Sequence, residues 1–151
     1  MAELKLRNLK ETKKAAEEVA GLVSRRESRD GAVVLALTGD LGSGKTTFIK
    51  FLARKLGVKS KLSSPTFLIM RGFNMHDKGF PQERFYHIDA YRLKSSEDLL
   101  SLGFGELVSD KNNIIAIEWA ERVKDILPKD KIDLFFKHGK GENERTLTIK
   151  Q

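Results

Sequence analysis

The feature that most constrains the fold is a glycine-rich segment, GDLGSGKT at residues 39–46, which lies between two apolar segments. It matches the pattern G-x-x-x-x-G-K-S/T, in which glycines let successive backbone N–H groups point at phosphate oxygens. The run before it, AVVLAL at 32–37, is continuously aliphatic, which is typical of a strand buried on both faces in a parallel sheet. Residues 45–57 carry apolar side chains at helical spacing. The sequence therefore predicts a strand, a phosphate-binding loop and a helix, in that order.

This loop predicts a nucleotide site with defined roles for its residues. The ammonium of Lys45 is expected to reach the β- and γ-phosphates, and the hydroxyl of Thr46 is expected to ligate Mg²⁺. The helix that begins near Lys45 adds its positive end to the phosphate cradle. The residues assigned to the nucleotide from this motif are Gly39, Asp40, Leu41, Gly42, Ser43, Gly44, Lys45 and Thr46.

The rest of the chain alternates strands and helices early and has mainly strands late. The further elements expected are a strand at 3–9, a helix at 11–29, a strand within 63–73, a loop at 74–82, a strand at 84–93, a short capped helix at 95–103, a buried strand beginning near 112 and ending at Glu118, and a β-hairpin of 131–139 with 144–150. This order predicts an α/β fold, a P-loop NTPase-like core whose mostly parallel sheet has antiparallel strand additions. We expect one P-loop ATPase domain over residues 1–151.

Composition excludes several classes of protein. The chain has no cysteine, which rules out disulfides and thiolate metal sites. Its apolar runs are far shorter than the roughly 20 residues that cross a bilayer, and its first residues lack the apolar segment of a secretory signal. We therefore expect a cytoplasmic protein with no membrane partner. The net charge of +7 favours RNA, acidic proteins or nucleotide phosphates as partners, and it serves solubility equally well.

A P-loop protein needs a second acidic residue for Mg²⁺, and the segment IIAIEW supplies it. Its aliphatic residues lead to Glu118, which is expected at the carboxyl edge of the sheet, where ligands bind in open α/β folds. The guanine-reading motif N-K-x-D is absent from the sequence, which favours ATP over GTP. A small-molecule kinase would also need an acceptor pocket and a lid, for which 151 residues leave little room.

Beyond the P-loop, six segments of the chain resemble the bacterial TsaE family, also called YjeE, in order and spacing. They are GDLGSGKTTF, SSPTFLI, YHIDAYRL, EDLLSLGFGEL, IIAIEWAERV and LPKD, and the resemblance extends from about residue 4 to about residue 149. It implies a subunit that binds ATP and Mg²⁺ and hydrolyses ATP slowly when alone. It also implies action on the TsaB–TsaD heterodimer, which threonylcarbamoylates N6 of adenosine 37 in tRNAs that read ANN codons. This chain would then meet tRNA indirectly, through the complex.

The resemblance implies roles for individual residues as well. Asp89 would orient or deprotonate the attacking water, and Glu118 would be associated with the metal ion together with Thr46. Thr47 would face the α-phosphate. The expected catalytic residues are therefore Asp89, Lys45 and Glu118, and the expected metal ligands are Thr46 and Glu118.

Several further positions have two interpretations. Thr66 matches a switch-like segment that contacts the γ-phosphate or Mg²⁺, and it is equally compatible with an ordinary turn. Thr12 either contacts adenine or caps the first helix. Arg145 either approaches the nucleotide or is a lone surface arginine. Arg92 either stabilises transition-state charge or forms a structural ion pair, and Trp119 either packs in the core or meets a partner.

One segment departs from the family. GFNMHDKGFPQER, between the two middle strands, is longer than the turn expected there, and a lengthened hairpin tip is the simplest interpretation. A metal site from His76, Asp77 and His87 would match no common ligand spacing. Two other functions use the same P-loop: a small-molecule kinase, and an ATP-gated binding switch without significant turnover.

Overall fold

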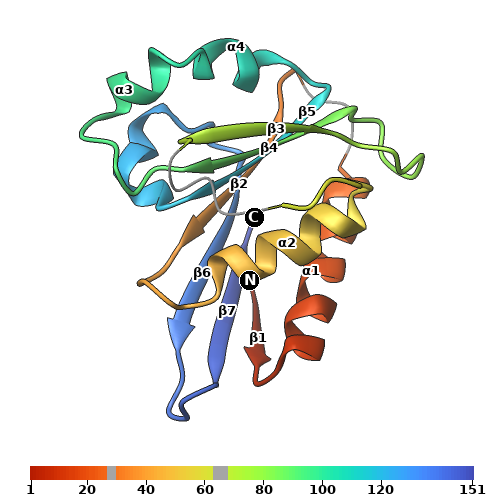
Figure 1. The fold of residues 1–151 in the computed structure, drawn as a ribbon, viewed down its shortest axis with the longest axis vertical. Helices are drawn as coiled ribbons and strands as arrows, with labels where there is room; N and C mark the ends of the chain where they lie inside the picture. Colours follow the sequence, from red (N-terminus) through yellow and green to blue (C-terminus); the bar gives the residue numbers. More distant parts are fainter. Residues whose placement is uncertain (27–29, 63–67) are drawn as a thin grey trace.

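The computed structural model describes residues 1–26, 30–62 and 68–151. Its elements are arranged around one seven-stranded sheet (Figure 1). In chain order they are β1 (Ala2–Leu6), α1 (Leu9–Ser24), β2 (Val33–Thr38), α2 (Lys45–Lys55), β3 (Met70–Asn74), β4 (Arg84–Asp89), α3 (Ser96–Leu100), α4 (Phe104–Ser109), β5 (Asn113–Glu118), the 3₁₀ helix η1 (Ala120–Ile126), β6 (Ile132–His138) and β7 (Arg145–Lys150). In the described part of the chain, no helix is long and apolar enough to cross a bilayer.

The strand order is β1-β7-β6-β2-β5-β4-β3. The central strands β6, β2, β5 and β4 are mutually parallel, whereas β3, β7 and β1 each join the sheet by antiparallel pairing. The predicted α/β class, with a mostly parallel sheet and antiparallel additions, is thereby confirmed. The continuous apolar run becomes β2, at the centre of the sheet, where parallel neighbours on both sides and helices on both faces remove it from water.

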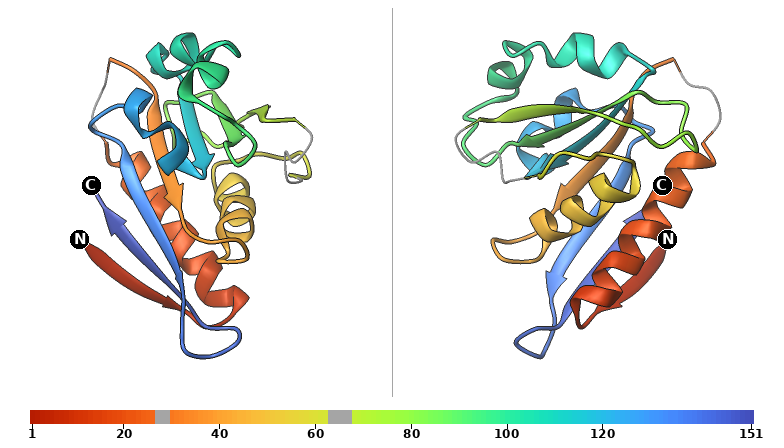
Figure 2. Two further views of the ribbon diagram at one scale, coloured as in Figure 1. Left: turned by 90° about the vertical axis from the view of Figure 1, so that its left-hand side faces the viewer. Right: turned by 45° about the vertical axis from the view of Figure 1, so that its right-hand side comes forward.

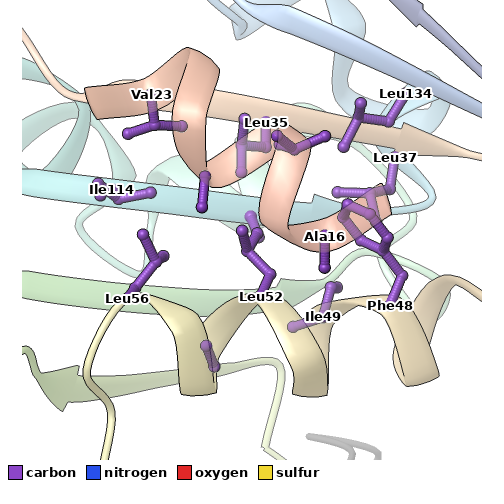
Figure 3. Packing of buried hydrophobic residues seen from close by; sticks show 14 of the residues in the cluster. Ala16, Val23, Leu35, Leu37, Phe48, Ile49, Leu52, Leu56, Ile114 and Leu134 are labelled. Carbon is purple, nitrogen blue, oxygen red and sulfur yellow. The ribbon is translucent and has the colours of Figure 1, made fainter. Parts of the chain in front are cut away.

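Alternate residues of the central strands supply two cores, one on each face of the sheet. Leu35 and Ile114 face α1 and α2. They pack there with Leu52 of α2 and Ala16 of α1, among other residues of that core (Figure 3). Val34, one residue from Leu35, faces the opposite side and packs in the core formed with α3, α4 and η1. The two turned views show α2 and η1 on opposite sides of the strands (Figure 2). The P-loop leads from β2 into α2 and so lies toward the face of the sheet that α2 covers.

Some predicted boundaries were wrong. The first helix begins at Leu9 and ends at Ser24 rather than spanning 11–29, of which 27–29 lie outside the described residues. The strand expected at 84–93 ends at Asp89, because the carboxylate of that residue accepts a hydrogen bond from the backbone N–H of Tyr91 and starts a turn. The expected serine cap of the short helix is also absent, since Ser95 makes no capping hydrogen bond. Helices α4 and η1 were not predicted.

Candidate nucleotide-binding and catalytic site

The P-loop connects the carboxyl end of β2 to the first residue of α2, as the motif predicts. Gly39 begins the loop against the neighbouring strand β6. A Cβ atom at this position would lie 2.6 Å from the carbonyl oxygen of Phe136 and 2.7 Å from Oγ of Ser43. Only glycine therefore lets the loop pass so close to β6, which gives the first glycine of the motif its physical reason.

The side chain of Lys45 is held inside the loop. Its ammonium donates to the carbonyl oxygens of Gly39 and Asp40, the second at 3.1 Å, and lies 4.4 Å from the ring centre of Trp119. Burial lowers the pKa of Lys45, and the surrounding carboxylates, Glu118 first, oppose that shift. A cation that has already lost part of its water is well placed to bind phosphate oxygens.

Glu118 is the last residue of β5 and is buried, with only 3% of its surface exposed. Its Oε1 accepts a hydrogen bond of 2.8 Å from the hydroxyl of Thr46, the second residue of α2. Its Oε2 lies 2.6 Å from Nε2 of His87, a buried residue of β4. The carboxylate therefore connects the P-loop helix to two adjacent strands of the sheet.

Strand register brings the two predicted acids to one place. β4 and β5 are parallel, and Asp89 lies opposite Glu118 while His87 lies opposite Ala116. Since side chains alternate between faces, both acids and His87 lie on the face that carries α2. From the sequence alone, His87 is a candidate only for a metal site that matches no common ligand spacing. Its position two residues before Asp89 on a predicted strand was the signal that it shares the same face.

Asp89 has the electrostatics of a proton acceptor. Partial burial raises the pKa of its carboxyl group, and the nearby Glu118 raises it further. The backbone N–H of Tyr91, which donates to Oδ1 at 3.0 Å, opposes the rise, as do the charges of His87 and Lys45. A carboxylate with a raised pKa is a stronger base than an exposed one, which suits it to accept a proton from water.

Trp119 follows Glu118 in a conformation that few residues other than glycine adopt, with φ of 57°. This left-handed turn ends β5 and directs the chain into η1. The indole packs against the ring of Tyr91, with centroids 5.0 Å apart, and Arg122 lies over both rings. An unfavourable backbone conformation maintained by such contacts is common at functional sites. No motif in the sequence predicted that Arg122 would contact these two rings.

Two cavities adjoin the loop. One, of about 380 Å³, is lined by the P-loop together with Asp89, Glu118 and Trp119, and also by Arg92. The other, of about 450 Å³, lies on the opposite side of the loop and is lined by the three predicted residues Thr12, Thr47 and Arg145, among others. The chain segments that supply these three residues are distant in sequence. The structure thus places them around one space beside the phosphate loop.

The alternatives for Thr12 and Arg145 are now decided in part. Thr12 does not cap the first helix: the side chain of Asn8 accepts from the N–H of Glu11, and the hydroxyl of Thr12 donates to the carbonyl of Asn8 at 3.2 Å. Arg145 is not a lone surface arginine, because its Nε donates to the carbonyl oxygen of Gly42 in the P-loop at 3.2 Å. Arg145 is therefore hydrogen-bonded to the loop, and Thr12 lines the cavity beside it.

Two sets of candidates remain: Thr66, and the residues considered for a metal site. Thr66 lies outside the described residues. His76 and Asp77 line a different cavity, at the far end of α2, whereas His87 is buried against Glu118. Within 1–26, 30–62 and 68–151, no group of three or more side chains is arranged to hold a metal ion. The hypothetical site formed by His76, Asp77 and His87 is thereby contradicted.

The chain is similar in sequence to known proteins along most of its length. A sequence model described as "Threonylcarbamoyl adenosine biosynthesis protein TsaE" matches residues 6–147. The tRNA threonylcarbamoyladenosine biosynthesis protein TsaE of Bacillus subtilis is 36% identical over 152 residues, which span 99% of this chain and 86% of that protein. The protein of the same name from Borreliella burgdorferi is 45% identical over 99 residues, or 66% of this chain and 68% of that protein.

A solved structure supports the same relationship. The crystal structure of Bacillus subtilis YdiB superposes with a TM-score of 0.69 and 28% identity, covering 98% of this chain and 83% of that one. The match of the family model extends over almost the whole chain, from β1 to β7. This chain therefore belongs to the TsaE family of threonylcarbamoyl adenosine biosynthesis proteins.

Proposed function

We propose that this chain is a Mg²⁺-dependent ATPase that is required for N6-threonylcarbamoylation of adenosine 37 in tRNAs reading ANN codons, and that it acts in the cytoplasm on the TsaB–TsaD heterodimer. Membership of the TsaE family supports the assignment to threonylcarbamoyl adenosine biosynthesis. The observation that carries the ATPase assignment is the hydrogen bond between Thr46 and Glu118, which joins the P-loop helix to the acid at the end of β5. A hydroxyl and a carboxylate side by side beneath a phosphate loop are the oxygen ligands that Mg²⁺ prefers.

In this proposal the P-loop binds the phosphates of ATP. Thr46 and Glu118 would hold Mg²⁺, which when bound would neutralise charge on the β- and γ-phosphates. Lys45 would exchange its carbonyl partners for phosphate oxygens. The cavity lined by Thr12, Thr47 and Arg145 has the volume for the adenosine part of the nucleotide.

Hydrolysis then needs a positioned water. Asp89 would accept a hydrogen bond from this water and take its proton as the oxygen bonds to the γ-phosphorus. The bond from the γ-phosphorus to the bridging oxygen breaks, and ADP leaves with that oxygen. Partial burial raises the pKa of Asp89, the neighbouring charge of Glu118 adds to the rise, and the carboxylate is therefore a better proton acceptor than an exposed one.

The experiment that tests this function is ATP hydrolysis by the full chain, alone and with TsaB–TsaD from the same organism, in Mg²⁺. We expect slow hydrolysis alone, faster hydrolysis with the heterodimer, and tRNA modification that needs this chain for repeated rounds. Transfer of phosphate to a small molecule instead of water would favour a kinase. ATP binding with no turnover under either condition would favour an ATP-gated switch.

Replacing Asp89 by asparagine is expected to lower activity without lowering stability. The loss of the base should lower turnover by about 100-fold or more. The raised pKa of Asp89 means that folding disfavours its charged form, so the charge costs stability above the folded-state pKa and costs nothing below the ordinary carboxyl pKa of about 4. The variant should therefore melt at the same temperature as the parent or higher at pH 7.5, and the difference should vanish near pH 4.

Thermal denaturation without nucleotide and with a metal chelator measures this effect. Asp98→Asn, at an exposed carboxylate in α3, is the matched control that should leave turnover unchanged. A lower melting temperature for Asp89→Asn at pH 7.5 would contradict the assigned electrostatics, and unchanged turnover would remove Asp89 from the mechanism.

A further inference from the structure

A third cavity, separate from the two beside the P-loop, lies at the end of α2 that points away from that loop. Its volume is about 910 Å³, and it is lined by the second half of α2, by the residues that follow the helix, and by the tip of the β3–β4 hairpin. In the ribbon the hairpin tip extends beside the end of α2 (Figure 1). The residues of this cavity take no part in the proposed ATPase site.

The walls of this cavity are held together by a close backbone contact. Gly57, which follows α2, has φ of +87°, and a Cβ there would lie 2.4 Å from the backbone nitrogen of Asp77. Its carbonyl accepts a hydrogen bond of 3.0 Å from the N–H of His76. Met75 and Phe80 anchor the hairpin tip against the core that also contains α2. The long loop noted in the sequence is therefore a fixed wall of the cavity.

The charge of the cavity lining is strongly one-sided. Among the lining residues that the structure describes, five are cations and one, Asp77, is a carboxylate. All five are exposed, and none of them forms an ion pair with a described residue. The cations are Lys50, Arg54, Lys59, Lys61 and Lys78.

Helix stability explains only part of this cluster. A cation in the last turn of a helix interacts favourably with the helix dipole, and Arg54 is in that position. Lys50 lies in the middle of α2, and Lys78 lies on the hairpin tip, so neither serves that purpose. Unpaired cations on two opposing walls repel one another, and that repulsion is relieved when an anion occupies the space between them.

We propose that this cavity binds the phosphodiester backbone of RNA. The inference rests on the proposed function, since a tRNA-modifying assembly supplies a polyanion in the immediate surroundings. RNA is favoured over an acidic protein because four of the five cations are lysines, which bind phosphates as point charges. In addition, none of the lining residues that the structure describes is an aromatic anchor of the kind that protein interfaces use. Within the described lining there is no phenylalanine, tyrosine or tryptophan, so these residues are expected to contact the RNA backbone rather than to stack on bases. This proposal adds a direct RNA contact to the expected indirect one through the complex.

The test measures binding of a fluorescently labelled, unmodified tRNA transcript that reads an ANN codon to the full chain, by anisotropy, at several salt concentrations without nucleotide. The cavity variant is Lys50→Glu with Lys78→Glu, one change on each wall. The control is Lys124→Glu with Lys129→Glu, which alters net charge equally at exposed positions in and after η1, on the other face of the sheet. We expect the cavity variant to weaken binding at least about 10-fold and to flatten its salt dependence, and the control to change affinity less than about 3-fold.

Equal weakening by both double variants would overturn the proposal, because RNA binding would then depend on the net charge of the chain and not on the cavity. Failure of the parent chain to bind the transcript would overturn it as well, as would a cavity variant that loses TsaB–TsaD binding while RNA binding is unchanged. Lys50→Gln with Lys78→Gln, which removes charge without reversing it, guards against misfolding and should give a smaller loss in the same direction. ATP hydrolysis by the isolated cavity variant should equal that of the parent. A failure of the RNA-binding proposal can therefore be distinguished from a failure of the proposed ATPase function.

Discussion

Replacing Glu118 by glutamine is expected to lower ATP hydrolysis by on the order of 100-fold or more while ATP binding persists, because the nucleotide is held mainly by the P-loop. Glutamine keeps the length of the side chain and an oxygen that accepts from Thr46, so the 2.8 Å contact with α2 can survive. What disappears is the negative charge beside Thr46 and opposite Asp89. In the proposed mechanism that charge would hold the metal ion. It also adds to the rise in the pKa of Asp89, which burial causes first.

Two measurements check this result: steady-state phosphate release, and equilibrium binding of a fluorescent ATP analogue. Glu121→Gln is the matched control, since Glu121 is exposed and still contributes negative charge near Lys45. Its turnover should stay within about 3-fold of the parent. If Glu118→Gln hydrolyses ATP at the parental rate, then Glu118 serves only to fix Thr46 and His87 in place.

Replacing Lys45 by alanine is expected to weaken ATP binding by about 10- to 100-fold, which corresponds to one or two charge-assisted hydrogen bonds. The ammonium is already buried among the carbonyls of Gly39 and Asp40, and so it has little further water to lose when phosphate arrives. Burial lowers the pKa of Lys45, which means that folding disfavours its charge. The alanine variant should therefore remain folded, with a melting temperature close to that of the parent.

Isothermal titration with ATP in Mg²⁺ gives the affinity, and circular dichroism gives the melting temperature. Lys55→Ala, at the exposed end of the same helix, should bind ATP like the parent. Unchanged affinity in the Lys45 variant would remove the P-loop assignment itself. A collapse in melting temperature would instead show that Lys45 is a structural residue that supports the loop.

The parts of the fold that could be predicted from sequence are those set by neighbours along the chain. The aliphatic run became the central strand β2, and the glycines with the helical pattern after them became the P-loop and α2. Helices α4 and η1 were missed because each is shorter than two full turns of α-helix and is stabilised by distant contacts, through Phe104 and Val123 in the core. Such short segments show no periodicity of their own.

For the site, the sequence by itself determined which chemical groups are present: a phosphate loop, a buried acid at a strand end and a second acid in the segment YHIDAYRL. Only the tertiary structure decided which of them meet. The pairing of β4 with β5 sets Asp89 opposite Glu118 and buries His87 beside the same carboxylate, and the hairpin tip at His76 closes on Gly57 to form the basic cavity. The reason is physical: local patterns follow from interactions a few residues apart, whereas register and cavity walls depend on segments that become neighbours only after the chain has folded.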